Sequence, residues 1–127
     1  MIQLEFQMIR AHFPGGDRPA VRLRVRTTGS AIDYTIRLSA ALRVVNLTHS
    51  LYDVMCAVAA LEMRDGHATI PQVHLRLACT YNNVQLHLLR NQELFMELPD
   101  HKPRRFRLSP EAIKLMGKIK KRIARHE

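Results

Sequence analysis

Apolar and polar residues alternate along much of the first forty residues, which is the pattern of strands with one buried face. Three stretches show it: residues 2–8, 21–26 and 32–38. In the second stretch the apolar side chains take one face, and Arg22, Arg24 and Arg26 take the other. Turn-forming residues at 14–17 and 27–30 separate the three stretches. The chain is therefore predicted to start as a meander with one apolar face.

From residue 48 the apolar spacing becomes helical. The residues at this spacing form two adjacent stripes: Leu51, Val54, Met55, Val58 and Leu61, and beside them Tyr52, Cys56, Ala59 and Met63. Thr48 or Ser50 can cap the start of this helix, and Gly66 is placed to end it in the left-handed conformation. The preceding residues, 42–47, fit either a fourth strand or an early helical turn.

A helix with so much apolar surface needs cover on two sides, and one sheet covers only one of them. A second element or a second subunit must supply the rest. We expect a homodimer whose interface is formed by Leu51, Tyr52, Met55, Cys56, Ala59 and Met63.

The second half of the chain again predicts strands followed by a helix. Four stretches have strand patterns: residues 73–79, 84–88, 94–98 and 104–108. Asn82-Asn83 is the predicted turn of a hairpin between the first two. Ser109, Pro110 and Glu111 combine a capping hydroxyl, a first-turn proline and a first-turn acid. They predict a final helix that runs nearly to the end.

The two halves show a candidate internal repeat. Shifting the sequence by 61 positions places residues 43–55 over residues 104–116, and the apolar positions and the helix-capping hydroxyl coincide. Two elements of the same type match by chance fairly often, so a true repeat and a coincidence are both open. As a repeat, residues 1–66 and 67–127 would each be a ββββα unit.

A tandem ββββα organisation resembles that of the Whirly, PUR and PC4-like nucleic-acid-binding proteins. The resemblance extends over most of the chain and rests on the order of elements and the polarity of the strand faces, without a signature motif of those families. It implies curved antiparallel sheets packed against helices, with nucleic acid on the sheet faces. The expected fold class is α+β, with antiparallel sheets and two helices in a single domain, residues 1–127.

Positive charge is concentrated at the end of the chain. The formal net charge is +9, and residues 101–127 hold ten basic residues against two acidic ones. Such a surface can neutralise phosphates and release their counterions. The residues expected to do so are Lys102, Arg104, Arg105, Arg107, Lys114, Lys118, Lys121, Arg122 and Arg125. The alternative is a solvated helix with cations near its negative C-terminal end.

The arginine face of residues 21–26 is the second candidate site. Arg22, Arg24 and Arg26 repel one another, and a phosphate backbone would relieve this repulsion. The alternative is pairing with acids on neighbouring strands, such as Glu5 or Asp33. We expect both basic sites to work together as parts of one surface.

Enzyme signals are weak, because the sequence has no recognised catalytic or phosphate-cradling motif. His74 and His87 could face each other across the predicted hairpin, which keeps a small RNA-processing or nuclease-like activity as a minor hypothesis. Cys56 and Cys79 fit reduced, buried thiols better than a disulfide framework. No cofactor, metal or small-molecule substrate is expected, and the basic helix lacks the Trp and Phe that favour a membrane surface.

The sequence therefore predicts a non-enzymatic, homodimeric DNA-binding protein with low sequence specificity, which organises DNA or regulates transcription. Few aromatic residues are available to stack on unpaired bases, which counts against a dedicated reader of single-stranded bases and leaves electrostatic binding to duplex or single strands open. DNA is the expected partner in preference to RNA. The expected location is cytoplasmic, on the nucleoid or chromatin. The alternatives are a protein-interaction or assembly subunit with an acidic partner, and an RNA-binding protein.

Overall fold

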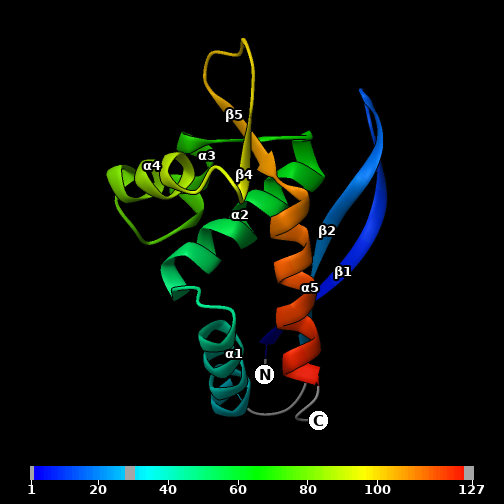
Figure 1. Ribbon diagram of the computed structural model, residues 1–127, viewed down its shortest axis with the longest axis vertical. Helices are drawn as coiled ribbons and strands as arrows, with labels where there is room; N and C mark the ends of the chain where they lie inside the picture. The colour runs from blue at the N-terminus through cyan, green and yellow to red at the C-terminus, as the bar shows by residue number, and fades with distance from the viewer. Residues whose placement is uncertain (1, 28–30, 125–127) are drawn as a thin grey trace.

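The protein is described by a computed structural model that covers residues 2–27 and 31–124. Its strands and helices are interspersed along the chain, mostly in pairs of one kind (Figure 1). In order they are β1 (Ile2–Phe13), β2 (Gly16–Thr27), α1 (Ala31–Val44), α2 (His49–Asp65), β3 (Ala68–Thr69), α3 (Ile70–Arg76), α4 (Tyr81–Arg90), β4 (Phe95–Leu98), β5 (Arg105–Leu108) and α5 (Pro110–Ala124).

The strands form two separate antiparallel sheets. One is the long β1–β2 hairpin, in which Ile2 pairs with Thr27 and Phe13 with Gly16. The other is a small sheet in the order β3–β5–β4. Figure 1 shows the hairpin along one side of the molecule and the β4–β5 strands projecting at one end. The predicted α+β class is confirmed, as are the strands predicted at residues 2–8, 21–26, 94–98 and 104–108.

Helix α2 is the centre of the core and packs against β2, β5, α3 and α4. Its local chemistry is as predicted. The N–H of Leu51 donates to Thr48 Oγ1 (3.1 Å), which caps the start. Gly66 ends the helix with φ 82°, and its N–H donates to the Glu62 carbonyl oxygen (2.8 Å). The left-handed conformation at this position favours glycine, because a side chain would meet its own backbone.

The chain itself covers the apolar surface of α2. The predicted interface residues Tyr52, Met55, Cys56 and Ala59 are all buried within one chain, and Leu51 and Met63 are half-buried. Burial raises the pKa of the Cys56 thiol to about 12, as expected for an inert core cysteine. The interface prediction is therefore corrected for the four buried residues, which offer no surface to a second subunit.

Three segments predicted as strands are helices instead. Residues 32–38 belong to α1, and residues 73–79 and 84–88 fall largely in α3 and α4, so the Asn82-Asn83 hairpin is also wrong. The open run at residues 42–47 contains the end of α1 followed by a turn. In each case an alternating apolar pattern also contained pairs four residues apart, which a helix places on one face.

The tandem ββββα order is therefore wrong for this chain. Its first half contains two strands and two helices, and its second half contains three short strands and three helices among the described residues. The resemblance to Whirly, PUR and PC4-like proteins depended on that order and gains no support from the observed order. The predicted final helix is confirmed as α5, where the N–H of Ala112 donates to Ser109 Oγ (3.1 Å).

Within the described ranges no single helix is long and apolar enough to cross a membrane. Helices α1 and α2 pass such a test together, by length and composition only, and are bent by 100° at the break between them.

Candidate nucleic-acid interface

Helices α3 and α4 are joined by a tight turn at residues 77–80. Thr69 starts α3 with a reciprocal capping box to Gln72. Thr80 caps α4 by accepting a hydrogen bond from the N–H of Asn83 (3.1 Å). His74 Nδ1 lies 3.1 Å from the Cys79 carbonyl oxygen, which ties the end of α3 to the turn. Two helices joined in this way form a helix–turn–helix, whose second helix enters the major groove of DNA in proteins that use the motif for binding.

Helix α4 turns one face inward and leaves the other to solvent. Val84 and Leu88, one turn apart, are buried in the core. By helical spacing the opposite face and its flanks carry Asn82, Asn83, Gln85, Leu86, Leu89 and Arg90. Of these six, the two asparagines and the arginine are exposed, and the others are partly exposed. We call these six residues the reading face.

One hydrogen bond outside this face fixes α4 on the body, and a second closes the last turn of the helix itself. His87 Nε2 and Ser50 Oγ are hydrogen-bonded at 2.8 Å, which links α4 to the first turn of α2. At the end of α4, Asn91 Nδ2 donates to the His87 carbonyl oxygen (2.8 Å). The helix is therefore held by its inner side, and Leu89 at the edge of the reading face also packs against the core.

Strands β4 and β5 and the loop at residues 99–104 between them form a projecting hairpin, which we call the wing (Figure 1). The Arg104 guanidinium binds the Glu97 carboxylate across the base of this loop, with Nε 2.7 Å from Oε2. This ion pair lowers the pKa of Glu97. His101 and Lys102 are exposed on the loop.

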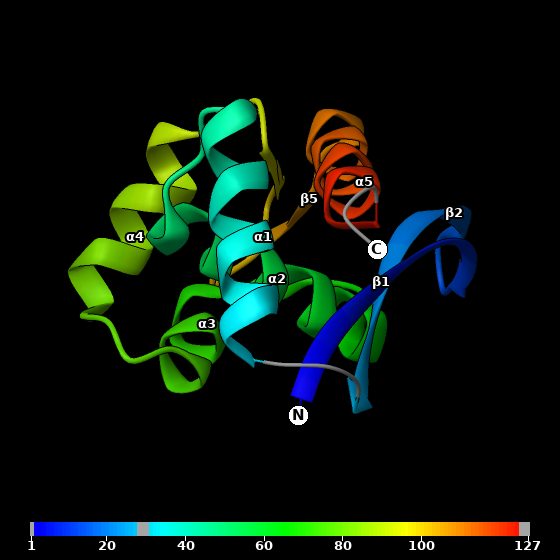
Figure 2. The same cartoon turned by 90° about the horizontal axis from the view of Figure 1, so that it is seen from below.

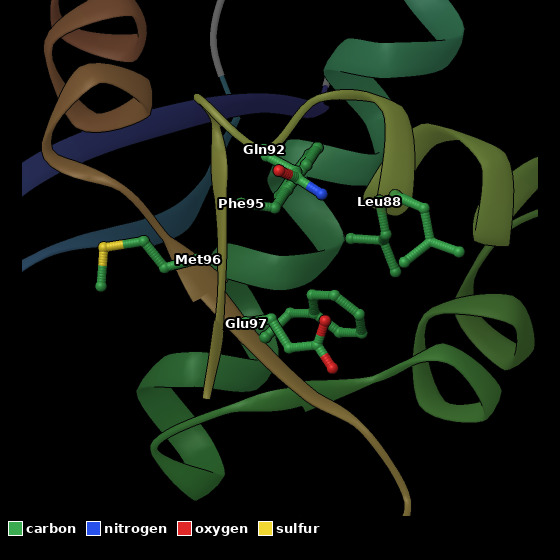
Figure 3. A pocket seen from close by; sticks show the side chains of 7 residues that line it. Leu88, Gln92, Phe95, Met96 and Glu97 are labelled. Atoms are coloured by element: carbon green, nitrogen blue, oxygen red, sulfur yellow. The ribbon is translucent and has the colours of Figure 1, made fainter. Parts of the chain in front are cut away.

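A groove separates α4 from the wing (Figure 3). Leu88, Phe95 and Phe106 form its buried apolar floor, and each is 1% exposed. Figure 3 shows Phe95 and Glu97 on the side of β4 that faces Leu88, whereas Met96 points to the opposite side. Because the floor is continuous with the core, α4 and the wing are held as one body.

Comparison with solved structures identifies a protein of the same fold. This chain is similar to a MarR family protein from Bacillus stearothermophilus, with a TM-score of 0.61 and 13% identity. The match covers 76% of this chain and 67% of the other. No protein-family model and no curated protein matches the sequence. The shared fold is a winged helix–turn–helix, in which α3, α4 and the wing lie together.

The basic residues predicted from sequence do not form one surface. Arg22 and Arg24 are exposed on β2, and the exposed cations of α5 include Lys114, Lys118, Lys121 and Arg122. Figures 1 and 2 place α5 and the hairpin on one side of the molecule and α3 and α4 on the other. We call the first of these the basic side. The side chain of Arg26, and all of Arg125, lie outside the described residues.

The basic residues that precede α5 lie in two different places. Lys102 and Arg104 lie on the wing, which is beside α4. Arg105 and Arg107 lie on one face of β5, whereas Phe106 between them faces the groove. Strand β2 and helix α5 contact each other, and that their cations act as one surface stays a prediction.

The alternating pattern of residues 73–79 and 84–88 predicts strands, so the reading face is not apparent from it. Two local signals were present. Thr69, Pro71 and Gln72 form a helix start with a capping box, and Thr80 has the character of a second cap. Together they predict two short helices in place of two strands.

The histidines proposed for catalysis have separate structural roles. His74 holds the turn between α3 and α4, and His87 holds α4 against α2. The hairpin that would have placed them face to face does not exist. In the described part of the chain, no group of three or more His, Cys, Asp or Glu side chains is arranged to hold a metal ion.

Proposed function

We propose that this protein is a non-enzymatic, DNA-binding transcription regulator that reads duplex DNA with α4. The observation that carries the proposal is the helix–turn–helix of α3 and α4, with a polar reading face exposed beside a projecting wing. In this proposal α4 lies in the major groove, and the wing approaches the neighbouring backbone through Lys102 and His101.

The side chains of the reading face suit base edges in the major groove. Asn82, Asn83 and Gln85 carry amides, which pair with the N6 and N7 edge of adenine. Arg90 can bind the O6 and N7 acceptors of guanine, and the partly exposed Leu86 can contact a thymine methyl group. Duplex RNA has a major groove that is too narrow for a helix, so this geometry favours DNA.

Low sequence specificity, with a DNA-organising role, is a second candidate function. The exposed cations of the basic side favour it, because contacts with phosphates are independent of sequence. They could hold a second stretch of DNA, or extend the contact of a bent one. The two candidates differ in how strongly the protein prefers a selected sequence over a random duplex.

Titration of a fluorescently labelled duplex, read by anisotropy at several salt concentrations, tests DNA binding itself. We expect the logarithm of the affinity to fall linearly with the logarithm of salt concentration, with a slope of about −0.9 per phosphate contacted. A single strand of the same sequence should bind more weakly. The absence of duplex binding at low salt would rule out the proposal.

We further propose that the protein acts as a homodimer through α1. Helix α1 exposes Ile32, Ile36 and Val44, which are 73%, 62% and 56% exposed, and Val44 at its end also borders the hollow between α1 and α5. Together with Ala40, they are spaced four residues apart and form one apolar stripe. Exposed aliphatic residues gathered on one helix face are typical of an interface.

This stripe is complementary to itself when two α1 helices run antiparallel about a two-fold axis that crosses the stripe between Ile36 and Ala40. In that register Ile32 meets Val44 of a second copy and Ile36 meets Ala40. The same register places Asp33 opposite Arg43, so that charges of opposite sign flank the apolar centre. Asp33 also pairs with Arg37 of its own helix (2.8 Å), which keeps the carboxylate at the edge of the stripe.

Sedimentation of α1 variants tests the dimer. Ile36→Arg is expected to give a monomer, because it places two like charges at the centre of the interface. Arg43→Asp should weaken the dimer, and the exchange Asp33→Arg with Arg43→Asp should restore it. Leu75→Arg, at an 84% exposed site on α3, is the matched control and should leave the dimer intact. A wild-type monomer, or a dimer unaffected by Ile36→Arg, would contradict this interface.

A further inference from the structure

A hollow lies on the face of the wing sheet that points away from α4. It is bounded by the turn of the β1–β2 hairpin, the end of α2 and the base of the wing. Its charged and polar lining comes from Asp17, Arg18, Asp65, His67, His101, Arg105 and Arg107. Neither the reading face nor the groove beside it shares these residues.

The acidic groups of this hollow already have partners. Asp17 is bound by His12 Nδ1, and both oxygens of Asp65 accept hydrogen bonds from Arg64. Arg18 is held by a donation from its Nη2 to the Gly66 carbonyl oxygen (2.8 Å) and lies over the Phe13 ring at 3.6 Å from its centroid, whereas its Nε is buried without a partner. These groups are fixed by the fold and leave little negative charge for further cations.

Among the described residues, the remaining cationic groups lack a direct hydrogen-bond or ion-pair partner, and the nearest negative charge to Arg107 among the groups that shift its pKa is the buried Glu62 carboxylate, which is already bound by Arg18 and the Leu108 N–H. Within residues 2–27 and 31–124, the side chains of Arg105 and Arg107 make no hydrogen bond or ion pair with another residue, and Arg107 Nε is buried without a partner. Burial, followed by the positive charge of Arg105, lowers the pKa of His67. A buried guanidinium nitrogen without an acceptor is costly, and a bound anion would supply that acceptor.

We propose that this hollow binds a phosphate group through Arg105 and Arg107, assisted by His67 and His101. Two arginines two residues apart on a strand present their guanidinium groups on one face, and such groups bind phosphate oxygens in a forked geometry. The phosphate comes either from a free anion, such as a phosphorylated small molecule, or from a DNA backbone that passes the wing. Binding to the free protein does not depend on the proposed function.

The site would also be connected to the DNA-binding surface through β5. This strand carries Arg107 on one face and Phe106, part of the groove floor beside α4, on the other. A phosphate held at Arg105 and Arg107 therefore acts on the strand that supports the wing. An effect of the anion on DNA affinity would be reciprocal, because binding free energies are coupled in both directions.

Inorganic phosphate is the probe for the first arm of the test. It is titrated into the protein without DNA at constant ionic strength, with calorimetry and the NMR signals of His67 as readouts. We expect saturable binding that weakens at least tenfold in Arg107→Gln. Arg105→Gln is the second variant in case the first does not fold. Lys120→Gln, which removes one exposed positive charge from α5, is the control and should bind as the wild type does.

The second arm uses a short duplex to separate the two sources. If phosphate still binds to the DNA-saturated protein, the natural ligand is a free anion. If DNA displaces phosphate, or if only the duplex affinity falls in Arg107→Gln, the ligand is a backbone phosphate. The inference is overturned if the two arginine variants change neither phosphate binding nor duplex affinity relative to Lys120→Gln. If the wild-type protein binds phosphate but does not bind DNA, the proposed function is contradicted and the phosphate site is still supported.

Discussion

Replacing Glu62 by Ala is expected to lower the free energy of unfolding by about 3–5 kcal/mol. The Glu62 side chain is on α2 and is 2% exposed. Its carboxylate accepts a hydrogen bond from the N–H of Leu108 (2.9 Å) on β5 and faces the Arg18 guanidinium (3.4 Å) on β2. Truncation leaves both donors without this acceptor in the interior. Urea unfolding followed by circular dichroism measures the loss, and a change below about 1 kcal/mol would contradict it.

Glu62→Gln is the matched control, because its amide oxygen keeps an acceptor for the N–H of Leu108. Burial raises the pKa of Glu62, although the Leu108 N–H and Arg18 oppose this shift. A carboxyl whose pKa is higher in the folded state stabilises the fold most when it is protonated. The stability of the wild type relative to Glu62→Gln should therefore fall as the pH rises from about 4 through the raised pKa.

Replacing Asn82 or Arg90 by Ala is expected to lower the affinity for a preferred DNA site by about 1–3 kcal/mol each. Both side chains are exposed on the reading face, and neither supports the core, so the fold should not change. The preferred site is first selected by the wild-type protein from a random duplex pool. Anisotropy titration of the selected and a random duplex then measures the loss, which should be larger for the selected one. Lys114→Ala, on α5, is the control and should not change that preference.

Local chemistry allowed several elements to be predicted from sequence. The Thr48 cap, the left-handed Gly66 and the Ser109 cap each depend on residues close together in the chain, and all three are observed. The β2 strand was equally clear, because its polar positions are arginines that cannot be buried without partners. Predictions of this kind need no knowledge of the rest of the fold.

The wrong predictions were segments whose apolar residues fit both the two-residue period of a strand and the period of a helix. Val84, Leu86 and Leu88 alternate as in a strand, but the fold buries the first and third and leaves Leu86 partly exposed, as a helix does. Ile32 and Ile36 fit a strand for the same reason, although the fold leaves them exposed on a helix. Alternation alone does not decide between these periods, and the caps at Thr69 and Thr80 are the local signals that favour helices here.

The candidate nucleic-acid interface moved from the basic end of the chain to α4 for a related reason. The density of charge in residues 101–127 is a property of sequence, but the face on which each cation lies depends on the path of α5. That path carries the helix along the hairpin, on the side away from α4 (Figure 2). The α2 surface assigned to a dimer was likewise covered by other elements of the same chain, which the sequence could not show.

Helix α4, and not α5, is proposed to read DNA. The most direct test compares two triple variants on the selected and the random duplex: Asn82→Ala, Gln85→Ala and Arg90→Ala on α4, and Lys118→Ala, Lys121→Ala and Arg122→Ala on α5. We expect the α4 variant to lose the preference for the selected duplex. The α5 variant should keep this preference and bind each duplex with the affinity of the wild type or a lower one. An α4 variant with unchanged affinity and preference, beside an α5 variant that no longer binds DNA, would contradict the account.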